Sequence, residues 1–424
     1  MSQNLVSKQT QIIHRTVLPN GIVVITVENS AADIIASRIF LRVGSQWEPR
    51  EKAGLSHLLS AVITKGTERL SSMEIAEQIE SAGAYLGADA TTDYFLLSLK
   101  TVSADWPEIF QLAGEILRSP SFPEAEVELE RSLTLQDIRS QKEQPFSLAF
   151  EQLRQAMYGD HPYGVSVMGT EATASELNRS DLEQYYQNYF HPNNMVISIA
   201  GRVTPEEAVQ QVEQVFGDWQ PRGIPQTKPP FPSLISQPCQ RKISQDTQQS
   251  VVMLGYLASS VHESDHIALK LINTYLGNGL SSRLFVELRE KRGLAYDVSA
   301  FYPARQLTSS FVTYMGTAPE NTQIAIDGLR TEVDRLCSSQ LSNDELQVAK
   351  NKLLGQYALG KQTNAQLAQV YGWYETLGLG IEFDVDFQQE VASVTPEVIQ
   401  EAAKRYFVKP YISLIGPAEA IDHL

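Results

Sequence analysis

The feature that most restricts the fold of this chain is an internal repeat with a spacing of about half its length. A Tyr-Phe pair followed by strand-forming residues occurs twice, which places Phe190 and Phe407 217 positions apart. A second match, an Ala-Tyr pair before another strand-like run, places Tyr85 and Tyr296 211 positions apart. Two similar offsets at separate places indicate duplication of one domain of about half the chain. The length of 424 residues also favours two domains over a single core.

A proline-rich stretch near the middle of the chain predicts the boundary between the two copies. Residues 218–238 have no apolar period and are typical of an extended linker. We therefore expect a first domain over residues 1–217 and a second over residues 239–424.

Each half mixes strands and helices. Residues 38–43, 95–102 and 196–200 are rich in strand formers. Ser71 with Glu74, and Thr204 with Glu207, have the spacing of capping boxes that open helices. Because strands and helices cluster rather than alternate strictly, the α+β class is favoured over a doubly wound sheet.

Composition excludes several kinds of partner. The 50 acidic and 34 basic residues give a formal charge of -16, which repels nucleic acid and anionic lipid and attracts cationic peptides. No apolar run is long enough to span a membrane, and the first residues lack the apolar core of a secretory signal. Cys239 and Cys337 are the only cysteines, and we expect both to be small buried residues rather than a disulfide. These observations favour a cytoplasmic protein without nucleic acid or membrane partners.

Residues 54–67 predict an amphipathic helix with an altered metal motif. His57, Ser60 and Ala61 lie off the apolar stripe of this helix, at the positions of the zinc-peptidase signature H-x-x-E-H. In that signature the two histidines bind zinc together and the glutamate polarises the attacking water. Ala61 has no ligand atom, and Ser60 is no base at neutral pH. The stripe itself consists of Leu55, Leu58, Leu59, Val62 and Ile63.

A second histidine pair offers a weaker metal candidate. His262 and His266 frame an H-x-x-D-H sequence just ahead of an apolar helix predicted over residues 267–276. The segment is polar and reads as a loop and helix start, so a solvated helix N-terminus is favoured over a metal site.

Four blocks together resemble the pitrilysin (M16) family of peptidases, of the small-subunit type related to the mitochondrial processing peptidase. The blocks span nearly the whole chain and are residues 54–67, 161–164, 189–201 and 276–296. The resemblance implies two homologous α/β-sandwich domains, with the metallohydrolase fold of that peptidase, related by internal duplication. It also places Asp137 at the position of the third zinc ligand, a glutamate in the family. His57 and Asp137 give at most two ligands, so the resemblance implies no metal cofactor in this chain.

In this family an Arg and a Tyr seven residues apart complete the active site. Arg289 and Tyr296 match that spacing. The arginine orients the substrate by its backbone carbonyl, and the tyrosine hydroxyl stabilises the oxyanion. Without the resemblance, Arg289 would be read as a helix surface charge and Tyr296 as a core aromatic.

Some members of the family divide the work between two chains, of which one has the zinc motif and the other has the Arg/Tyr pair. The resemblance therefore implies a zinc-less subunit that binds peptides and forms a heterodimer with a homologous H-x-x-E-H subunit, or a homodimer in isolation. The run 277–279 is too short for the glycine-rich presequence loop of the mitochondrial subunit, which favours a bacterial-type heterodimer. Two alternatives remain at this stage: a structural core-protein-like subunit, and a self-sufficient metallopeptidase with an atypical site.

Overall fold

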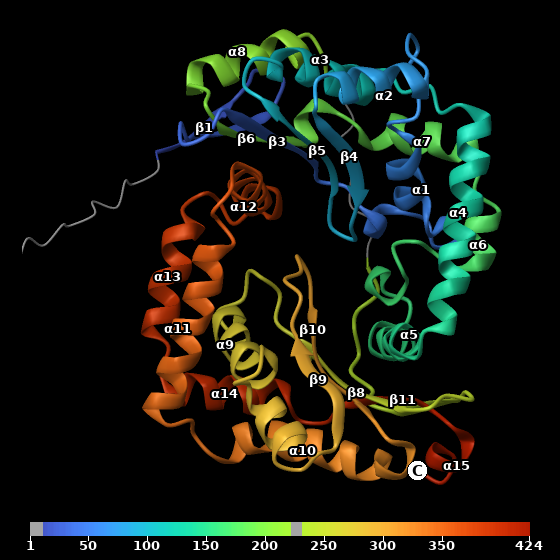
Figure 1. The fold of residues 1–424 in the computed structure, drawn as a ribbon, viewed down its shortest axis with the longest axis vertical. Coiled ribbons are helices and arrows are strands. Elements are labelled where there is room, and N and C mark those ends of the chain that lie inside the picture. The colour runs from blue at the N-terminus through green and yellow to red at the C-terminus, as the bar shows by residue number, and fades with distance from the viewer. Residues whose placement is uncertain (1–11, 222–230) are drawn as a thin grey trace, which may run out of the picture.

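The computed structural model describes residues 12–221 and 231–424 and contains two mixed sheets covered by helices (Figure 1). The first is six-stranded with the order β1-β2-β6-β3-β5-β4, and the second is five-stranded with the order β7-β11-β8-β10-β9. Residues 222–230, inside the predicted linker, lie outside the described residues. The first sheet comprises β1 (Ile13–Val17), β2 (Val23–Glu28), β3 (Ile34–Leu41), β4 (Tyr85–Ala90), β5 (Phe95–Val102) and β6 (Met195–Gly201). The second comprises β7 (Gln240–Ser244), β8 (Ser250–Ala258), β9 (Ala295–Phe301), β10 (Ser309–Thr317) and β11 (Tyr411–Gly416).

The two sheets have the same topology apart from β1. Each contains one parallel pair, β2 with β6 in the first sheet and β7 with β11 in the second. The order β2-β6-β3-β5-β4 then corresponds strand by strand to β7-β11-β8-β10-β9. Phe190 precedes β6 and Phe407 precedes β11, while Tyr85 and Tyr296 lie at the start of the edge strands β4 and β9. The α+β class and the duplicated architecture are confirmed.

Helices pack on both faces of each sheet. The helices of the first half are α1 (Leu55–Val62), α2 (Ser72–Ser81), α3 (Trp106–Arg118), α4 (Glu124–Glu143), α5 (Pro145–Tyr158), α6 (Glu171–Ser175), α7 (Arg179–Tyr189) and α8 (Pro205–Phe216). Those of the second half are α9 (His266–Gly277), α10 (Thr322–Ser338), α11 (Asn343–Leu359), α12 (Asn364–Leu377), α13 (Phe383–Ser393), α14 (Pro396–Tyr406) and α15 (Ala418–Ile421). The two capping boxes, at Ser71 and Thr204, are formed as predicted. The helix predicted over 267–276 runs from His266 to Gly277.

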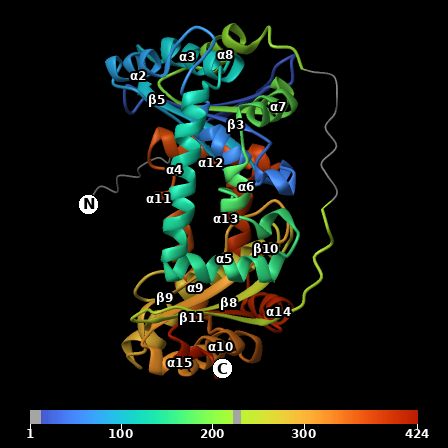
Figure 2. The same ribbon diagram turned by 90° about the vertical axis from the view of Figure 1, so that its right-hand side faces the viewer.

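The inner face of each sheet is covered by a helix from the other half of the chain. α12 packs on the first sheet, where Leu367 and Tyr371 meet Ile25 and Val196 in one apolar cluster. α5 packs on the second sheet, where Leu153 meets Met253 in another. Both helices lie between the two sheets, and the long helix α4 runs from one layer towards the other before α5 begins (Figures 1 and 2). Because each sheet is buried on both faces, its central strands are almost continuously apolar.

Polar contacts anchor α12 to the first sheet. The Glu375 carboxylate accepts two hydrogen bonds from the Arg15 guanidinium, at 2.9 and 2.8 Å, and lies 3.4 Å from Arg42. Asn364 donates to the Ile34 carbonyl at 2.8 Å. The Arg15 guanidinium lowers the pKa of Glu375, although burial opposes it. These bonds fix the position of α12 where apolar packing alone would allow it to slide.

One prediction about the cysteines was wrong. Cys239 is exposed and Cys337 is half-buried, and both are free thiols. Cys239 lies just before β7, an edge strand whose side chains are mostly exposed, so there is no core at that position to receive it.

Candidate functional site

The altered zinc motif lies on α1, whose apolar stripe is buried as predicted. Leu55, Leu58, Leu59 and Val62 all belong to the hydrophobic core of the first domain. Gly54 precedes the helix with a φ of 105°, and a Cβ there would lie 2.7 Å from the Met168 carbonyl oxygen. Only glycine combines that backbone conformation with so close an approach. The helix is therefore fixed in place by its surroundings, whatever its chemistry.

The carboxylate of Glu48 caps the first turn of α1. It accepts hydrogen bonds from the backbone amides of Gly54 at 2.9 Å and Ser56 at 2.5 Å, and also from the Ser56 hydroxyl. The Ser56 hydroxyl lies 3.0 Å from Tyr185 Oη, which donates to the Gly44 carbonyl at 3.0 Å. Burial raises the pKa of Glu48 to about 7, although its hydrogen bonds favour the ionised form.

This shift predicts how α1 responds to pH. A carboxyl whose folded pKa lies above its unfolded value, about 4.3, adds stability that is complete below that value and is lost as pH rises through about 7. We expect Glu48→Gln to remove about 1–2 kcal/mol of pH dependence between about pH 5 and pH 8. Urea unfolding at a series of pH values measures the effect, with Glu51→Gln as an exposed control on the next turn. Parallel profiles for wild type and Glu48→Gln would contradict the assignment.

The histidine at the first motif position lies near acidic residues of β4 and α4. His57 is half-buried. The Ser60 hydroxyl donates to the His57 backbone carbonyl at 2.7 Å, so this hydroxyl is occupied by a hydrogen bond within its own helix. Burial lowers the pKa of His57, while the negative charges of Asp137, Asp89 and Glu130 oppose that shift. Asp137 is exposed, on α4. The structure thus places Asp137 near enough to His57 to influence its charge, without a hydrogen bond between them.

Two acidic residues that lie near His57 in the structure were not identified from the sequence. Asp89 lies on the edge strand β4, and Glu130 lies seven positions before Asp137 on α4. Seven residues are two helical turns, so the spacing could have indicated that Glu130 shares the Asp137 face. Its carboxylate is 2.8 Å from Lys65 Nζ, which occupies it as an ion pair. Among the described residues no group of three or more His, Cys, Asp or Glu side chains could hold a metal ion.

The second histidine candidate has a structural role. His266 is buried in the first turn of α9, and its Nδ1 lies 3.0 Å from Tyr302 Oη. Burial lowers the pKa of His266 to about 3. Tyr302 in turn donates to the Ser259 carbonyl at 2.8 Å. His262 is exposed, and its positive charge adds to the lowering of the His266 pKa.

Arg289 and Tyr296 flank a turn that joins a short π-helix to β9. Arg289 belongs to the π-helix η5 (Phe285–Glu290), and its guanidinium stacks over the Phe285 ring at 5.1 Å. Gly293, with a φ of 63°, donates to the Arg289 carbonyl at 3.0 Å and reverses the chain. A π-helical turn is rare and often marks a functional site.

Tyr296 lies on an irregular part of the edge strand β9. Gly316 pairs with Asp297 and Thr317 pairs with Ala295, so the pairing omits Tyr296 in the manner of a β-bulge. Its side chain is 60% exposed, which excludes the alternative that it is a core aromatic. Within the described residues, neither the Tyr296 side chain nor the Arg289 side chain makes a hydrogen bond or ion pair. Both polar groups are therefore free to contact another molecule.

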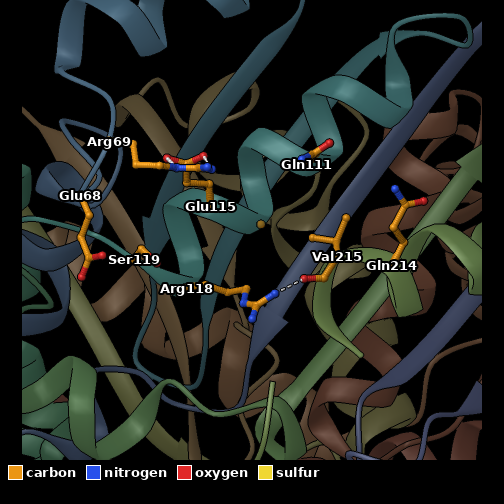
Figure 3. A pocket seen from close by; sticks show the side chains of 9 residues that line it. Glu68, Arg69, Gln111, Glu115, Arg118, Ser119, Gln214 and Val215 are labelled. Atoms are coloured by element: carbon orange, nitrogen blue, oxygen red, sulfur yellow. Dashed lines mark hydrogen bonds and ion pairs between the residues drawn. The ribbon is translucent and has the colours of Figure 1, made fainter. Parts of the chain in front are cut away.

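A separate cavity lies in the first domain. It has a volume of about 290 Å³ and lies between α3 and α8, and its charged walls are largely satisfied internally (Figure 3). Arg69 pairs with Glu115, and Arg118 donates to the Val215 carbonyl at 2.6 Å. None of the predicted site residues lines this cavity. In the part of the chain that the structure describes, no helix has the length and apolar character needed to cross a bilayer.

Comparison with known proteins agrees with this architecture. A family model described as "Insulinase (Peptidase family M16)" matches residues 23–171, and one described as "Peptidase M16 inactive domain" matches residues 176–353. The fold and the two matches define a peptidase-like protein built from two homologous domains. The chain belongs to the M16 peptidase family.

Relatives and solved structures cover nearly the full chain. A protein named uncharacterized zinc protease from Streptomyces coelicolor is 28% identical over 96% of this chain and 90% of its own length. One with the same description from Bacillus subtilis is 27% identical over 96% of this chain and 99% of its own. The structure of a protease from Helicobacter pylori superposes with a TM-score of 0.88 at 20% identity, covering 96% of this chain and 99% of that one. A peptidase M16 inactive domain from Pseudomonas fluorescens gives 0.85 at 24% identity, covering 96% and 98%. At these identities the structures support the fold alone.

Proposed function

We propose that this chain is the zinc-less subunit of a heterodimeric zinc endopeptidase and supplies Arg289 and Tyr296 to the active site of its partner. The observation that carries this proposal is the pairing of an altered motif helix with two exposed polar side chains, Arg289 on η5 and Tyr296 at the start of the edge strand β9. The partner would be a homologous chain with an intact H-x-x-E-H motif. In isolation, the chain would be inactive and could form a homodimer.

The possible zinc ligands on α1 and α4 favour a zinc site supplied by a partner over one within this chain. Ala61 removes one ligand, Glu130 is paired with Lys65, and Asp137 is exposed. A catalytic zinc site needs about three protein ligands and an open position. The residues of this chain do not fit that requirement, so we assign it no cofactor.

The chemistry of the Arg/Tyr pair suits peptide hydrolysis. A phenolic hydroxyl donates to an oxygen that gains negative charge as the peptide carbonyl is attacked, and a guanidinium holds the neighbouring carbonyl in place. Both donors must be free of hydrogen bonds inside their own protein. Neither side chain makes one within the described residues, although the Arg289 guanidinium stacks on Phe285. The bulge at Tyr296 turns its side chain away from the regular pleat of β9.

Peptide binding has a structural basis in the edge strands. β4 and β9 each end a sheet and have one unpaired backbone edge. An extended peptide can add to such an edge through main-chain hydrogen bonds, independently of most of its sequence. The formal charge of -16 favours peptides of positive charge. The scarcity of cysteine and the two free thiols are consistent with a cytoplasmic location.

Reconstitution with an H-x-x-E-H partner tests the proposal. We expect neither chain alone to cleave a fluorogenic peptide and the mixture to do so. Arg289→Ala should lower kcat/KM of the mixture about 10- to 100-fold, because a charged hydrogen bond to substrate is lost. Arg292→Ala, an exposed arginine three residues away, is the matched control and should leave kcat/KM unchanged.

Two results would refute the proposal. Equal activity with Arg289→Ala and Arg292→Ala would indicate a structural, core-protein-like subunit without a role in proteolysis. Stoichiometric zinc with activity in the isolated chain would indicate a self-sufficient metallopeptidase.

A further inference from the structure

A cavity of about 360 Å³ lies behind the π-helix that carries Arg289. It is bounded by α9, by residues 281–287 and by one face of α11. Its apolar lining comes from Tyr275, Val286, Val348 and Ala349. Val348 is 61% exposed and the nearby Leu280 is 75% exposed, so the apolar surface continues to the rim. This volume is within the range of small-molecule sites.

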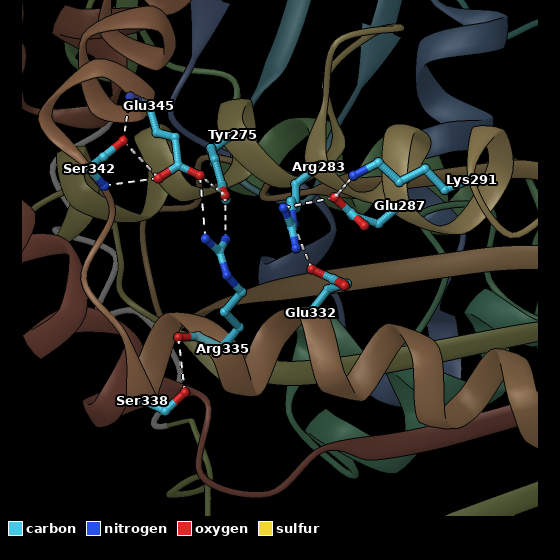
Figure 4. Close-up of polar contacts among 9 residues, drawn as sticks. All are labelled: Tyr275, Arg283, Glu287, Lys291, Glu332, Arg335, Ser338, Ser342 and Glu345. Carbon is cyan, nitrogen blue, oxygen red and sulfur yellow. Dashed lines mark hydrogen bonds and ion pairs between the residues drawn. The ribbon is translucent and has the colours of Figure 1, made fainter.

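Most charged groups of this cavity already have partners (Figure 4). Arg283 lies 2.9 Å from Glu287 and 2.7 Å from Glu332, and Glu287 also bonds Lys291 at 2.8 Å. On the opposite wall, the Glu345 carboxylate accepts hydrogen bonds from the Tyr275 hydroxyl at 2.9 Å and from the Ser342 amide at 2.9 Å, and Arg335 approaches it at 3.5 Å. These groups form the walls of the cavity and leave little charge to offer a ligand.

Among the basic side chains that line the cavity, Lys352 is the exception. Among the described residues no carboxylate pairs with its ammonium, which makes only a long contact of 3.4 Å to the Ser281 hydroxyl. The exposed Asp344 lies two helical turns away on α11, about 12 Å along the axis, too far to neutralise it. Burial lowers the pKa of Lys352, and a bound anion would reverse that effect.

We propose that this cavity binds a small apolar carboxylate, such as the C-terminal residue of a peptide. The carboxylate would pair with Lys352 Nζ and accept from the Ser281 hydroxyl at the rim. The apolar body would lie against Val286, Val348 and Ala349. Gly279, with a φ of 79°, leaves the loop beside Lys352 open, since a Cβ there would already lie 3.4 Å from the ammonium.

The site also touches the helix that carries the Arg/Tyr pair. Val286 and Glu287 line the cavity, and both belong to η5, as does Arg289. A ligand in the cavity would therefore contact the helix that carries Arg289 and stabilise its π-helical turn. The binding itself does not depend on the proposed peptidase role, and its test needs no activity.

Binding to the isolated full chain is measured by titration calorimetry with N-acetyl-L-leucine, and with N-acetyl-L-leucinamide as the uncharged match. We expect millimolar or tighter binding of the acid and at least about tenfold weaker binding of the amide. Lys352→Met keeps the length of the side chain and should weaken the binding of N-acetyl-L-leucine about tenfold. Lys350→Met, whose ammonium bonds the Ala392 carbonyl outside the cavity, is the matched control. Hexanoate distinguishes a general apolar acid from a peptide C-terminus as the ligand. If hexanoate binds as tightly as N-acetyl-L-leucine, the cavity accepts any apolar acid. If hexanoate binds more weakly, the cavity recognises a peptide C-terminus.

Methyl resonances locate the ligand if a variant folds poorly. Titration of the wild-type chain with N-acetyl-L-leucine should shift the methyl signals of Val286 and Val348 and leave that of the distant Val209 on α8 unchanged. Three results would overturn the proposal: no binding of the acid at millimolar concentration, equal binding of acid and amide, or shifts confined to residues outside the cavity.

Discussion

Tyr296→Phe is expected to reduce kcat/KM of the reconstituted two-chain peptidase about 100- to 1000-fold, which corresponds to about 3–4 kcal/mol of transition-state stabilisation. The substitution removes one hydroxyl and keeps the ring. Because the Tyr296 side chain is 60% exposed and bonds nothing within the described chain, its loss leaves no buried group unsatisfied. The free energy of unfolding should therefore stay the same. Steady-state kinetics with a fluorogenic peptide, together with urea unfolding, separate the two effects.

The matched control is another tyrosine of the same sheet. Tyr314 on β10 donates to the Asp297 carboxylate at 3.2 Å and stacks edge-on against Phe146 at 4.9 Å. Tyr314→Phe removes a hydroxyl of the same kind close to Tyr296 and should change kcat/KM less than about threefold. A Tyr296→Phe enzyme as active as Tyr314→Phe would show that the hydroxyl does not act on the reaction.

Gly372→Ala is expected to destabilise the chain by about 2 kcal/mol. Gly372 lies on α12 where that helix crosses the first sheet, and an added Cβ would lie 2.3 Å from Phe40 Cε2 and 2.9 Å from Ser198 Cβ. Phe40 is fully buried and Ser198 belongs to the central strand β6, so neither can move aside. The helix must retreat from the sheet and lose part of its apolar contact with Ile25 and Val196. Urea unfolding measures the loss.

Two other glycines serve as comparisons. Gly355 lies on α11 with nothing within 4 Å of an added Cβ, so Gly355→Ala should stabilise the chain by about 0.5–1 kcal/mol through helix propensity. Gly255 lies on β8 of the second sheet and faces α5. The atoms nearest to a Cβ added there would be Met157 Sδ at 2.6 Å and the Leu153 methyls at 3.0 Å. These flexible ends can shift, so Gly255→Ala should cost less than Gly372→Ala. An equal gain from Gly372→Ala and Gly355→Ala would contradict the close packing of α12.

The reciprocal placement of α5 and α12 gives this comparison a wider meaning. Each sheet depends on a helix from the other half for one of its two faces. A change that displaces α12 therefore weakens the first domain although the residue lies in the second. We expect the two halves to unfold together, because neither buries both faces of its sheet alone.

Some of this protein could be predicted from its sequence with good physical reason. The duplication followed from two offsets, and the buried stripe of α1 followed from a helical period in Leu55, Leu58, Leu59 and Val62. Both capping boxes were predicted because the bonds they contain join residues three positions apart. The absence of a ligand at Ala61 was equally certain, since it is a property of the side chain. Local patterns were reliable wherever the interactions that cause them are local.

Other predictions failed or were not possible because they depend on neighbours distant in sequence. Cys239 was expected in the core, but it precedes an edge strand with exposed side chains. His262 and His266 looked alike as candidates until the structure buried one ring against Tyr302 and left the other in solvent. The pairing of Glu130 with Lys65 joins α4 to the segment that follows α1, and no local pattern connects the two.

The sequence by itself determined that the chain contains two copies of one domain, that its zinc motif lacks two of its three functional side chains, and that an Arg and a Tyr stand seven residues apart. Only the tertiary structure decided that Tyr296 falls in an irregularity of an exposed edge strand, that Arg289 belongs to a π-helical turn, and that each half covers the sheet of the other. The physical reason is that side-chain chemistry and short-range periodicity are written along the chain. Exposure, strand pairing and the exchange of helices arise only when segments hundreds of residues apart compete for the same apolar surface.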